Sequence, residues 1–193
     1  MPRPQKSAKG HGRAFGPLFA AALAKQRRGR HAEAAALYEQ AIRADGSVAE
    51  AHNNRGCALL ALGRLEEAVT ALSAAVALRS DYADALDTLG VILAELGRHA
   101  EAVPYFERAL AAAPAAGVAF HYGNALLALE RFAQARAAFE RALELQPAYA
   151  AAHNGIGAAL ARGGDEAGAV AAFEAANGAA EFGRVPEEKR KRR

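Results

Sequence analysis

A short pattern of small and large residues recurs along most of this chain, and it constrains the fold more than any other feature. The pattern is an alanine, a large residue four positions later and a second alanine three positions after that. The copies begin at Ala34, Ala68, Ala102, Ala135 and Ala169, so the steps between them are 34, 34, 33 and 34 residues. The large residues are Tyr38, Leu72, Phe106, Phe139 and Phe173. A fixed period of this length predicts stacked repeats, each burying its apolar face against its neighbours.

A second small position lies twelve residues before each copy, at Ala22, Gly56, Gly90, Gly123 and Gly157. Between the two positions the apolar pattern is interrupted by a glycine or, in the fourth copy, by a glutamate; these residues are Gly29, Gly63, Gly97, Glu130 and Gly164. We therefore expect two antiparallel helices joined by a tight turn. Small residues let such helices approach closely, and large residues fill the space beside them. In the central copy Gly90 would face Ala102, with Phe106 beside them.

These residues and their period resemble the tetratricopeptide repeat (TPR) family, and the resemblance covers about residues 15–177. It implies an all-α fold, a right-handed α-solenoid of five helix-turn-helix repeats. The repeats would span about 15–48, 49–82, 83–115, 116–149 and 150–177. We expect the paired helices at about 17–28 and 31–44, 49–62 and 66–78, 83–96 and 99–112, 117–129 and 133–145, and 150–162 and 166–177.

The charges divide the chain into a mildly acidic body and two basic ends. The formal net charge is +3, yet residues 1–14 contain four basic and no acidic side chains, and residues 178–193 contain six basic and three acidic ones. The body between them therefore has more acidic than basic side chains. Because residues 1–14 show no periodicity, we expect a disordered basic N-terminal tail there, and a basic C-terminal tail over 178–193.

Cysteine usage and the first apolar run bear on the compartment. The single cysteine, Cys57, excludes a disulfide framework and favours a reducing, cytoplasmic location. The apolar residues 14–24 follow basic ones, so the alternative is export with a signal peptide in residues 1–24. Gly16 and Pro17 break that run, which favours a first helix with Pro17 in its first turn. No run reaches the roughly 20 apolar residues that span a bilayer.

We find no constellation of catalytic or metal-binding residues in the sequence. His52 and His153 occupy equivalent positions that the family often fills with tryptophan, so packing explains them better than metal binding. The segment Gly155-Ile156-Gly157 lacks the preceding strand and further glycine of a dinucleotide fingerprint. We therefore expect no enzymatic activity, no cofactor and no metal.

In the family, the first helices of successive repeats line a concave groove that usually holds a peptide or protein segment. The resemblance places ten residues of this chain there: Glu50, Asn53, Asn54, Asp84, Asp87, Thr88, Phe120, His121, Asn124 and Asn154. Asparagine offers both a donor and an acceptor, so it can pair with an extended backbone of any sequence. Asp84 and Asp87 share a helical face and would favour a positively charged ligand. We therefore expect a non-catalytic interaction scaffold whose partner is unidentified, with a basic segment as the favoured candidate.

One subtype of the family clamps the acidic C-terminus of heat-shock chaperones with lysine, asparagine and arginine side chains. Only Asn54 stands at such a position here, and the required lysines are missing. Asp84 and Asp87 would repel a carboxylate. We therefore expect no binding of chaperone tails.

Three further interpretations stay open. The chain could be an accessory TPR subunit of a glycosyltransferase system, because similar arrays precede the catalytic domain of bacterial protein O-linked N-acetylglucosamine transferases. The basic tails, including Lys189–Arg193, could make weak, salt-sensitive contacts with a membrane surface or with nucleic acid, although the lack of interleaved aromatic residues disfavours nucleic acid. Finally, the apolar face near Val170 and Phe173 lacks an obvious cover, so a folded-back end, a truncated sequence or self-association through this C-terminal end would explain it.

Overall fold

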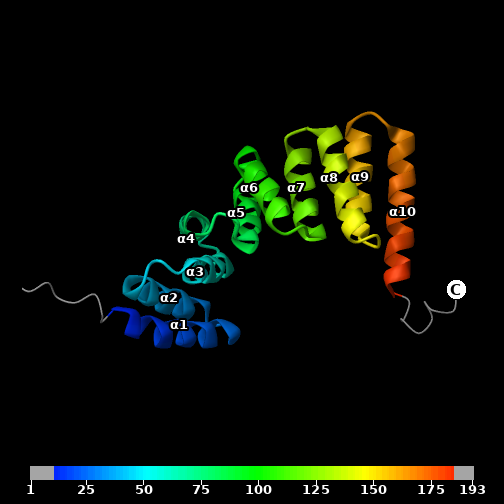
Figure 1. Ribbon diagram of the computed structural model, residues 1–193. Helices are drawn as coiled ribbons and strands as arrows, with labels where there is room; N and C mark the ends of the chain where they lie inside the picture. The colour runs from blue at the N-terminus through cyan, green and yellow to red at the C-terminus, as the bar shows by residue number, and fades with distance from the viewer. Residues whose placement is uncertain (1–10, 185–193) are drawn as a thin grey trace, which may run out of the picture. The chain divides into compact units, whose positions relative to one another are not determined.

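The computed structural model of this protein describes residues 11–184, with side chains described over 14–179, and every regular element in that range is an α-helix (Figure 1). The helices follow one another in pairs: α1 (His11–Arg27) and α2 (His31–Ala44), α3 (Ala49–Ala61) and α4 (Leu65–Leu78), α5 (Ala83–Glu95) and α6 (His99–Ala112), α7 (Ala116–Ala128) and α8 (Phe132–Leu145), and α9 (Ala150–Arg162) and α10 (Glu166–Arg184). The all-α fold of five helix-turn-helix repeats is confirmed.

The chain forms two compact units, and the division between them falls after Ile92, inside α5. The N-terminal unit contains α1 to α4 and most of α5, and the C-terminal unit contains the rest. In the N-terminal unit α1 packs on α2, α2 on α3 and α3 on α4. In the C-terminal unit the succession runs from α6 to α10, and α7 also contacts α9 (Figure 1). Each helix thus touches mainly its neighbours in sequence, as the repeat period predicts.

The glycines of the first helices are needed for the close approach within a repeat. A Cβ built on Gly56 of α3 would lie 2.6 Å from Cγ of Leu72 on α4. A Cβ built on Gly123 of α7 would lie 2.5 Å from Cε1 of Phe139 on α8. Both distances are too short for carbon atoms, so in these repeats the large residue of the second helix packs directly on the glycine. Gly90 is buried in α5, and its approach to the following helix stays a prediction.

The large residues of the pattern form the centre of the packing. Tyr38, Leu72, Phe106 and Phe139 are all 0% exposed. The fifth, Phe173 on α10, is 41% exposed. Burial of such side chains is the main stabilising contribution in a fold whose other core positions are mostly alanine.

The turn between the two helices of a repeat requires a left-handed residue. The glycines there have φ between 70° and 91°, at Gly29, Gly63, Gly97 and Gly164. In the fourth repeat the same conformation is taken by Glu130, with φ of 59°. A side chain with a Cβ is strained in this region by about 1–2 kcal/mol, so Glu130 is the one costly turn residue of the described set.

The first helix is longer than the sequence pattern predicts. It begins at His11, and Pro17 lies within it. The prediction of a start near residue 17, with Pro17 in the first turn, is therefore wrong. A proline in a helix interior removes only its own backbone donor and crowds one preceding carbonyl, and the alanine-rich residues that follow are strong helix formers.

The last helix also extends past its predicted end at residue 177, to Arg184. Gly178 lies inside it at a cost of about 1 kcal/mol relative to alanine, which the flanking alanines offset. The tail expected from residue 178 therefore overlaps this helix. The predictions for residues 1–10 and 185–193, which include most of both basic tails, lie outside the described residues.

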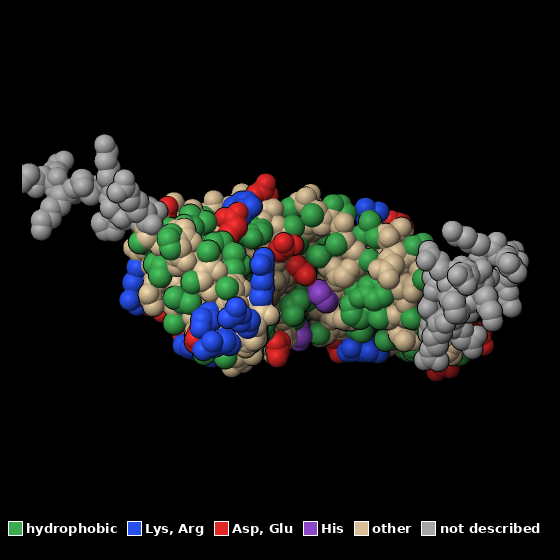
Figure 2. All heavy atoms as spheres, turned by 90° about the horizontal axis from the view of Figure 1, so that it is seen from below, with side chains coloured by type: hydrophobic (Ala, Val, Ile, Leu, Met, Phe, Trp, Pro, Cys, Tyr) green, Lys and Arg blue, Asp and Glu red, His purple; other side chains and the backbone are tan. Residues whose placement is uncertain are grey.

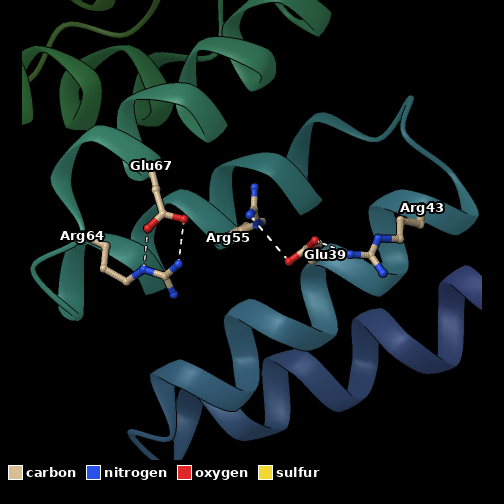
Figure 3. A network of polar contacts seen from close by, with 5 residues as sticks. All are labelled: Glu39, Arg43, Arg55, Arg64 and Glu67. Atoms are coloured by element: carbon tan, nitrogen blue, oxygen red, sulfur yellow. Dashed lines mark hydrogen bonds and ion pairs between the residues drawn. The ribbon is translucent and has the colours of Figure 1, made fainter.

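One ion pair joins the first two repeats, and further ion pairs lie close to it within each repeat (Figure 3). Arg55 of α3 points toward Glu39 of α2, with 3.7 Å between Nη2 and Oε2, and Glu39 also pairs with Arg43 one turn away. The guanidinium of Arg64, the residue before α4, donates twice to Glu67 on α4, at 2.6 and 2.7 Å. Exposed ion pairs contribute about 0–1 kcal/mol, so these pairs add little to the stability of the fold.

Candidate functional site

Five polar residues of the N-terminal unit form one surface, which we call the N-terminal cluster. Glu50, Asn53, Asn54 and Cys57 follow the helical spacing of three and four along α3, so they share one face of that helix. Asp84, near the start of α5, lies close enough to Cys57 to affect its ionisation. Two successive first helices therefore contribute to the cluster.

Asn53 is the buried member of the N-terminal cluster. Its side chain is only 7% exposed, and Nδ2 donates to Oδ1 of Asn54 at 3.3 Å. Its own Oδ1 is buried and has no hydrogen-bond partner among the residues that the structure describes. An unpaired buried acceptor costs about 1–3 kcal/mol. The fold alone gives no return for this cost.

Tyr38 of α2 lies next to the N-terminal cluster. Its hydroxyl donates to Oε1 of Gln26 on α1 at 2.6 Å and lies against the side chain of Asn54. Burial raises the pKa of Tyr38 to about 12, so the phenol keeps its proton at neutral pH. A polar contact thus connects the first three helices of the chain.

Cys57 and Asp84 give the cluster its electrostatic character. Burial, and secondly the charge of Asp84, raise the pKa of the half-buried Cys57 thiol. The thiol is therefore protonated at neutral pH and is a poor nucleophile. Burial also raises the pKa of the nearby Tyr82, and the charges of Glu50 and Asp84 act in the same direction while Arg79 opposes them.

Glu50 lies at the edge of the cluster and already has a partner. It forms an ion pair with Arg79, the residue that follows α4. The guanidinium carbon of Arg79 lies 3.8 Å from the centre of the Tyr82 ring. These contacts join the start of α3 to the segment that follows α4. Glu50 is therefore less available to a ligand than Asp84.

Two more predicted residues follow Asp84 on α5. Thr88 donates its hydroxyl to the backbone carbonyl of Asp84 at 2.7 Å, which uses its hydrogen within the helix. Asp87 and Thr88 are half-buried, whereas Asp84 is exposed. Of the two predicted aspartates on this helix, Asp84 is therefore the one more open to solvent.

In the C-terminal unit, the predicted aromatic residues belong to the packing. The ring of Phe120 on α7 lies 5.7 Å from that of Phe139 and 5.3 Å from that of Tyr149. The neighbouring His121 lies 6.1 Å from Phe106 on α6. Both Phe120 and His121 are half-buried, so they present only part of a ring to solvent.

Two exposed amides complete the predicted set. Asn124 lies on α7 and Asn154 on α9, and these two first helices contact each other directly. Both belong to the C-terminal unit. The structure thus gathers the predicted residues into one set for each unit.

The described residues contain no candidate metal site. Among them no three His, Cys, Asp or Glu side chains gather closely enough to bind a metal ion. His52 is held by the loop before α3, with Nε2 3.0 Å from the carbonyl oxygen of Gly46.

None of the described helices combines the length and the apolar character needed to cross a membrane. An open hollow of about 600 Å³ between α8 and the α9–α10 turn contains none of the predicted residues.

Sequence reasoning missed the contacts that Tyr38, Gln26 and Arg79 make beside the N-terminal cluster. Tyr38 carries a detectable signal, because it alone among the five large residues of the pattern has a hydroxyl group. Gln26 and Arg79 lie at the ends of helices, where the repeat pattern makes no statement about side chains.

Comparisons with known proteins agree with this architecture. A family model for the tetratricopeptide repeat matches residues 19–83, 54–117 and 123–183. A crystal structure of MamA is 22% identical, with 88% of this chain and 93% of that chain covered and a TM-score of 0.84. MamA from Desulfovibrio magneticus RS-1 is 24% identical, with 89% and 98% covered and a TM-score of 0.83.

A third similar structure is YrrB, described as a TPR protein with an unusual peptide-binding site. It is 22% identical, with 90% of this chain and 93% of that chain covered and a TM-score of 0.79. At such identities the likeness shows the fold alone. No curated protein sequence is similar enough to match.

Proposed function

The chain belongs to the tetratricopeptide repeat family, and we propose that it is a non-catalytic scaffold whose first helices hold a segment of another protein. The family supports a role in protein interaction, and the peptide-binding site described for YrrB supports the use of this fold for peptides. The expected cytoplasmic location and the absence of enzymatic activity stay predictions.

The observation that carries this proposal is the unpaired Oδ1 of Asn53. A buried acceptor in this place is costly unless a ligand supplies a donor. An extended peptide has backbone N–H groups and, if it is basic, Lys or Arg side chains. Asp84 adds an exposed negative charge beside Cys57. The N-terminal cluster therefore favours a donor-rich, basic segment.

The C-terminal unit supplies a second contact surface for the same kind of ligand. Asn124 and Asn154 are exposed on neighbouring helices, and each offers a donor and an acceptor to a peptide backbone. The half-buried ring of Phe120 provides apolar contact. These residues do not distinguish one peptide side chain from another. Selection of a basic peptide therefore depends on the N-terminal cluster.

The test is selection of peptides from a displayed random library, with wild-type protein and the Asp84→Lys/Asp87→Lys variant as baits. We expect the wild type to enrich peptides rich in Lys and Arg, and the variant to lose that enrichment. Glu140→Lys/Glu144→Lys is the matched control, because it makes the same charge change on two exposed residues of the second helix α8. It should select the same peptides as the wild type.

Two outcomes would contradict the proposal. Enrichment of acidic peptides by the wild type would reverse the assigned charge preference. Identical peptide sets for the wild type and the Asp84→Lys/Asp87→Lys variant would show that the ligand binds elsewhere.

A further inference from the structure

The large residue on α10 is more exposed than the large residues on the other four second helices. Phe173 is 41% exposed and Val170 is 58% exposed, whereas the residues equivalent to Phe173 in the other four repeats are fully buried. Among the described elements α10 packs on α9 alone. This face therefore lacks the helix that would follow it in a longer array.

The contacts inside each unit show what such a helix provides. The large residue of one repeat contacts the residue two positions before the small position of the next first helix. Tyr38 meets Asn54 in this way, and the ring of Phe106 lies 6.1 Å from that of His121. Phe139 lies so close to Gly155 that a Cβ there would be 2.7 Å from its ring.

Among the described helices, only one first helix has no second helix packed on that position. It is α1, where the equivalent residue is Ala20, which is small and exposed. We propose that α10 of one copy docks on α1 of a second copy, as though α1 were the first helix of a sixth repeat. Phe173 of the first copy then packs on Ala20 of the second.

A second repeat-to-repeat contact supports the same pairing through charge. Arg162, five residues after the small position of α9, donates to the carbonyl of Leu127 at 3.1 Å, and its guanidinium carbon lies 5.2 Å from the centre of the Phe132 ring. Only α1 carries an arginine at the same position, Arg27, which is exposed. In the last repeat the residue equivalent to Phe132 is Glu166, so docking brings Arg27 to a carboxylate.

The sequences of α1 and α10 are also complementary in charge. The sequence of α1 contains no acidic residue and includes Lys25 and Arg27, whereas α10 contains three glutamates and a single arginine at its end. The contact joins two different surfaces, so repeated use adds further copies, in a ring or in an open chain, instead of ending at a twofold dimer. This assembly is independent of the peptide ligand proposed above.

The test uses two variants that each block one end. Phe173→Glu places a charge on the apolar face of α10, and Ala20→Glu places one on the exposed face of α1. In sedimentation velocity, the wild type should grow in mass with concentration, and each variant alone should stay monomeric. An equimolar mixture should form a two-chain complex and nothing larger, because one intact end of each kind remains.

The charge contact has its own test. Arg27→Glu should weaken the assembly at low salt, and the double variant Arg27→Glu/Glu166→Arg should restore it. Circular dichroism melting of each variant shows whether it is folded. If Phe173→Glu fails to fold, Val170→Glu replaces it, because Val170 is more exposed.

Three results would overturn the proposal. A wild type that stays monomeric at every concentration would mean that residues 185–193 or solvent cover α10. An Ala20→Glu variant that still associates would indicate pairing of α10 with α10. A double charge variant no better than Arg27→Glu would remove the Arg27–Glu166 contact.

Discussion

At the scale of one residue, Asn53 lowers the stability of the fold and, in the proposed function, offers a hydrogen-bond acceptor to the ligand. Its unpaired Oδ1 is a cost to the folded state. Replacement by leucine, which has a similar shape, removes the unpaired acceptor. We expect Asn53→Leu to raise the free energy of unfolding by about 1 kcal/mol, measured by urea denaturation, and to reduce capture of basic peptides.

Asn124→Leu is the control for this prediction, because it makes the same change at an exposed amide. It should leave stability within about 0.5 kcal/mol of the wild type. A destabilised Asn53→Leu protein would mean that the amide is satisfied in solution. Unchanged peptide capture would mean that the ligand does not use it.

Glu130 presents a second cost at a single position, in the turn of the fourth repeat. Its φ of 59° suits glycine, which occupies the same place in the other four turns. We expect Glu130→Gly to stabilise the protein by about 0.5–1 kcal/mol, measured as a rise in the free energy of unfolding, because relief of strain exceeds the added entropy of the unfolded chain.

The substitution also removes an exposed ion pair with Arg162, in which the closest atoms are 3.3 Å apart. Glu130→Ala separates the two effects, because it loses the pair and keeps the strained conformation. It should change stability by no more than about 0.5 kcal/mol. Equal stability of the Gly and Ala variants would show that the turn is not strained.

At the scale of the helix pair, the close approach of α7 and α8 depends on the absence of a side chain at Gly123. The nearest ring atom of Phe139 would lie 2.5 Å from a Cβ there. We expect Gly123→Ala to lower the free energy of unfolding by about 1–3 kcal/mol through overpacking. Thermal and urea denaturation measure this loss.

Gly117, on the same helix, is the matched control. A Cβ built there meets no atom within 4 Å. Gly117→Ala should therefore be neutral or stabilising by up to about 1 kcal/mol, because alanine is the better helix former. If both variants had the same effect, helix propensity would explain the result and the proposed packing would not.

The arrangement of α3 against α5 predicts the ionisation of the single cysteine. Burial and the charge of Asp84 both raise the pKa of Cys57. Asp84→Asn removes the second cause, so the pKa should fall while burial still holds it above its ordinary value. The pH dependence of thiol labelling should move to lower pH in this variant.

Asp81→Asn is the control, since Asp81 precedes α5 and has no part in the raised pKa of Cys57. It should label with the same pH dependence as the wild type. A shift in the opposite direction in Asp84→Asn would contradict the placement of the two residues. Because the chain has one cysteine, the labelling signal has a single source.

Helix pairing was predictable from sequence because it depends on residue size at fixed spacing. The bounds of α2, α6 and α9 agree with those expected from the pattern. The ends of α1 and α10 were not predictable in the same way. Pro17 and Gly178 are usual signals of a helix boundary, and long alanine-rich flanks overrode them.

The candidate site was less predictable than the fold. The repeat register assigns each residue to a helix face, but it does not say which side chains already pair within the protein. Glu50 is bound to Arg79, and Thr88 is bound to the carbonyl of Asp84. The unpaired acceptor of Asn53 depends on the amides and hydroxyls packed around it, which a linear pattern cannot contain.

For the whole molecule, membership of the tetratricopeptide repeat family accounts for a chain of alanine-rich helix pairs that pack through small and large residues at a fixed spacing. Its two units offer different surfaces, one acidic around Asp84 and one built from neutral amides and aromatic rings. We therefore expect the N-terminal unit to select a basic segment. The exposed ends at α1 and α10 would add assembly to this binding function.

The most direct test of the account is a titration of ¹⁵N-labelled protein with a Lys- and Arg-rich peptide recovered by selection, followed by nuclear magnetic resonance. The account predicts that the side-chain amide signals of Asn53 and Asn54 and the backbone signals of Cys57 and Asp84 shift first. Shifts confined to the second helices, or an equal response to an acidic peptide, would contradict it.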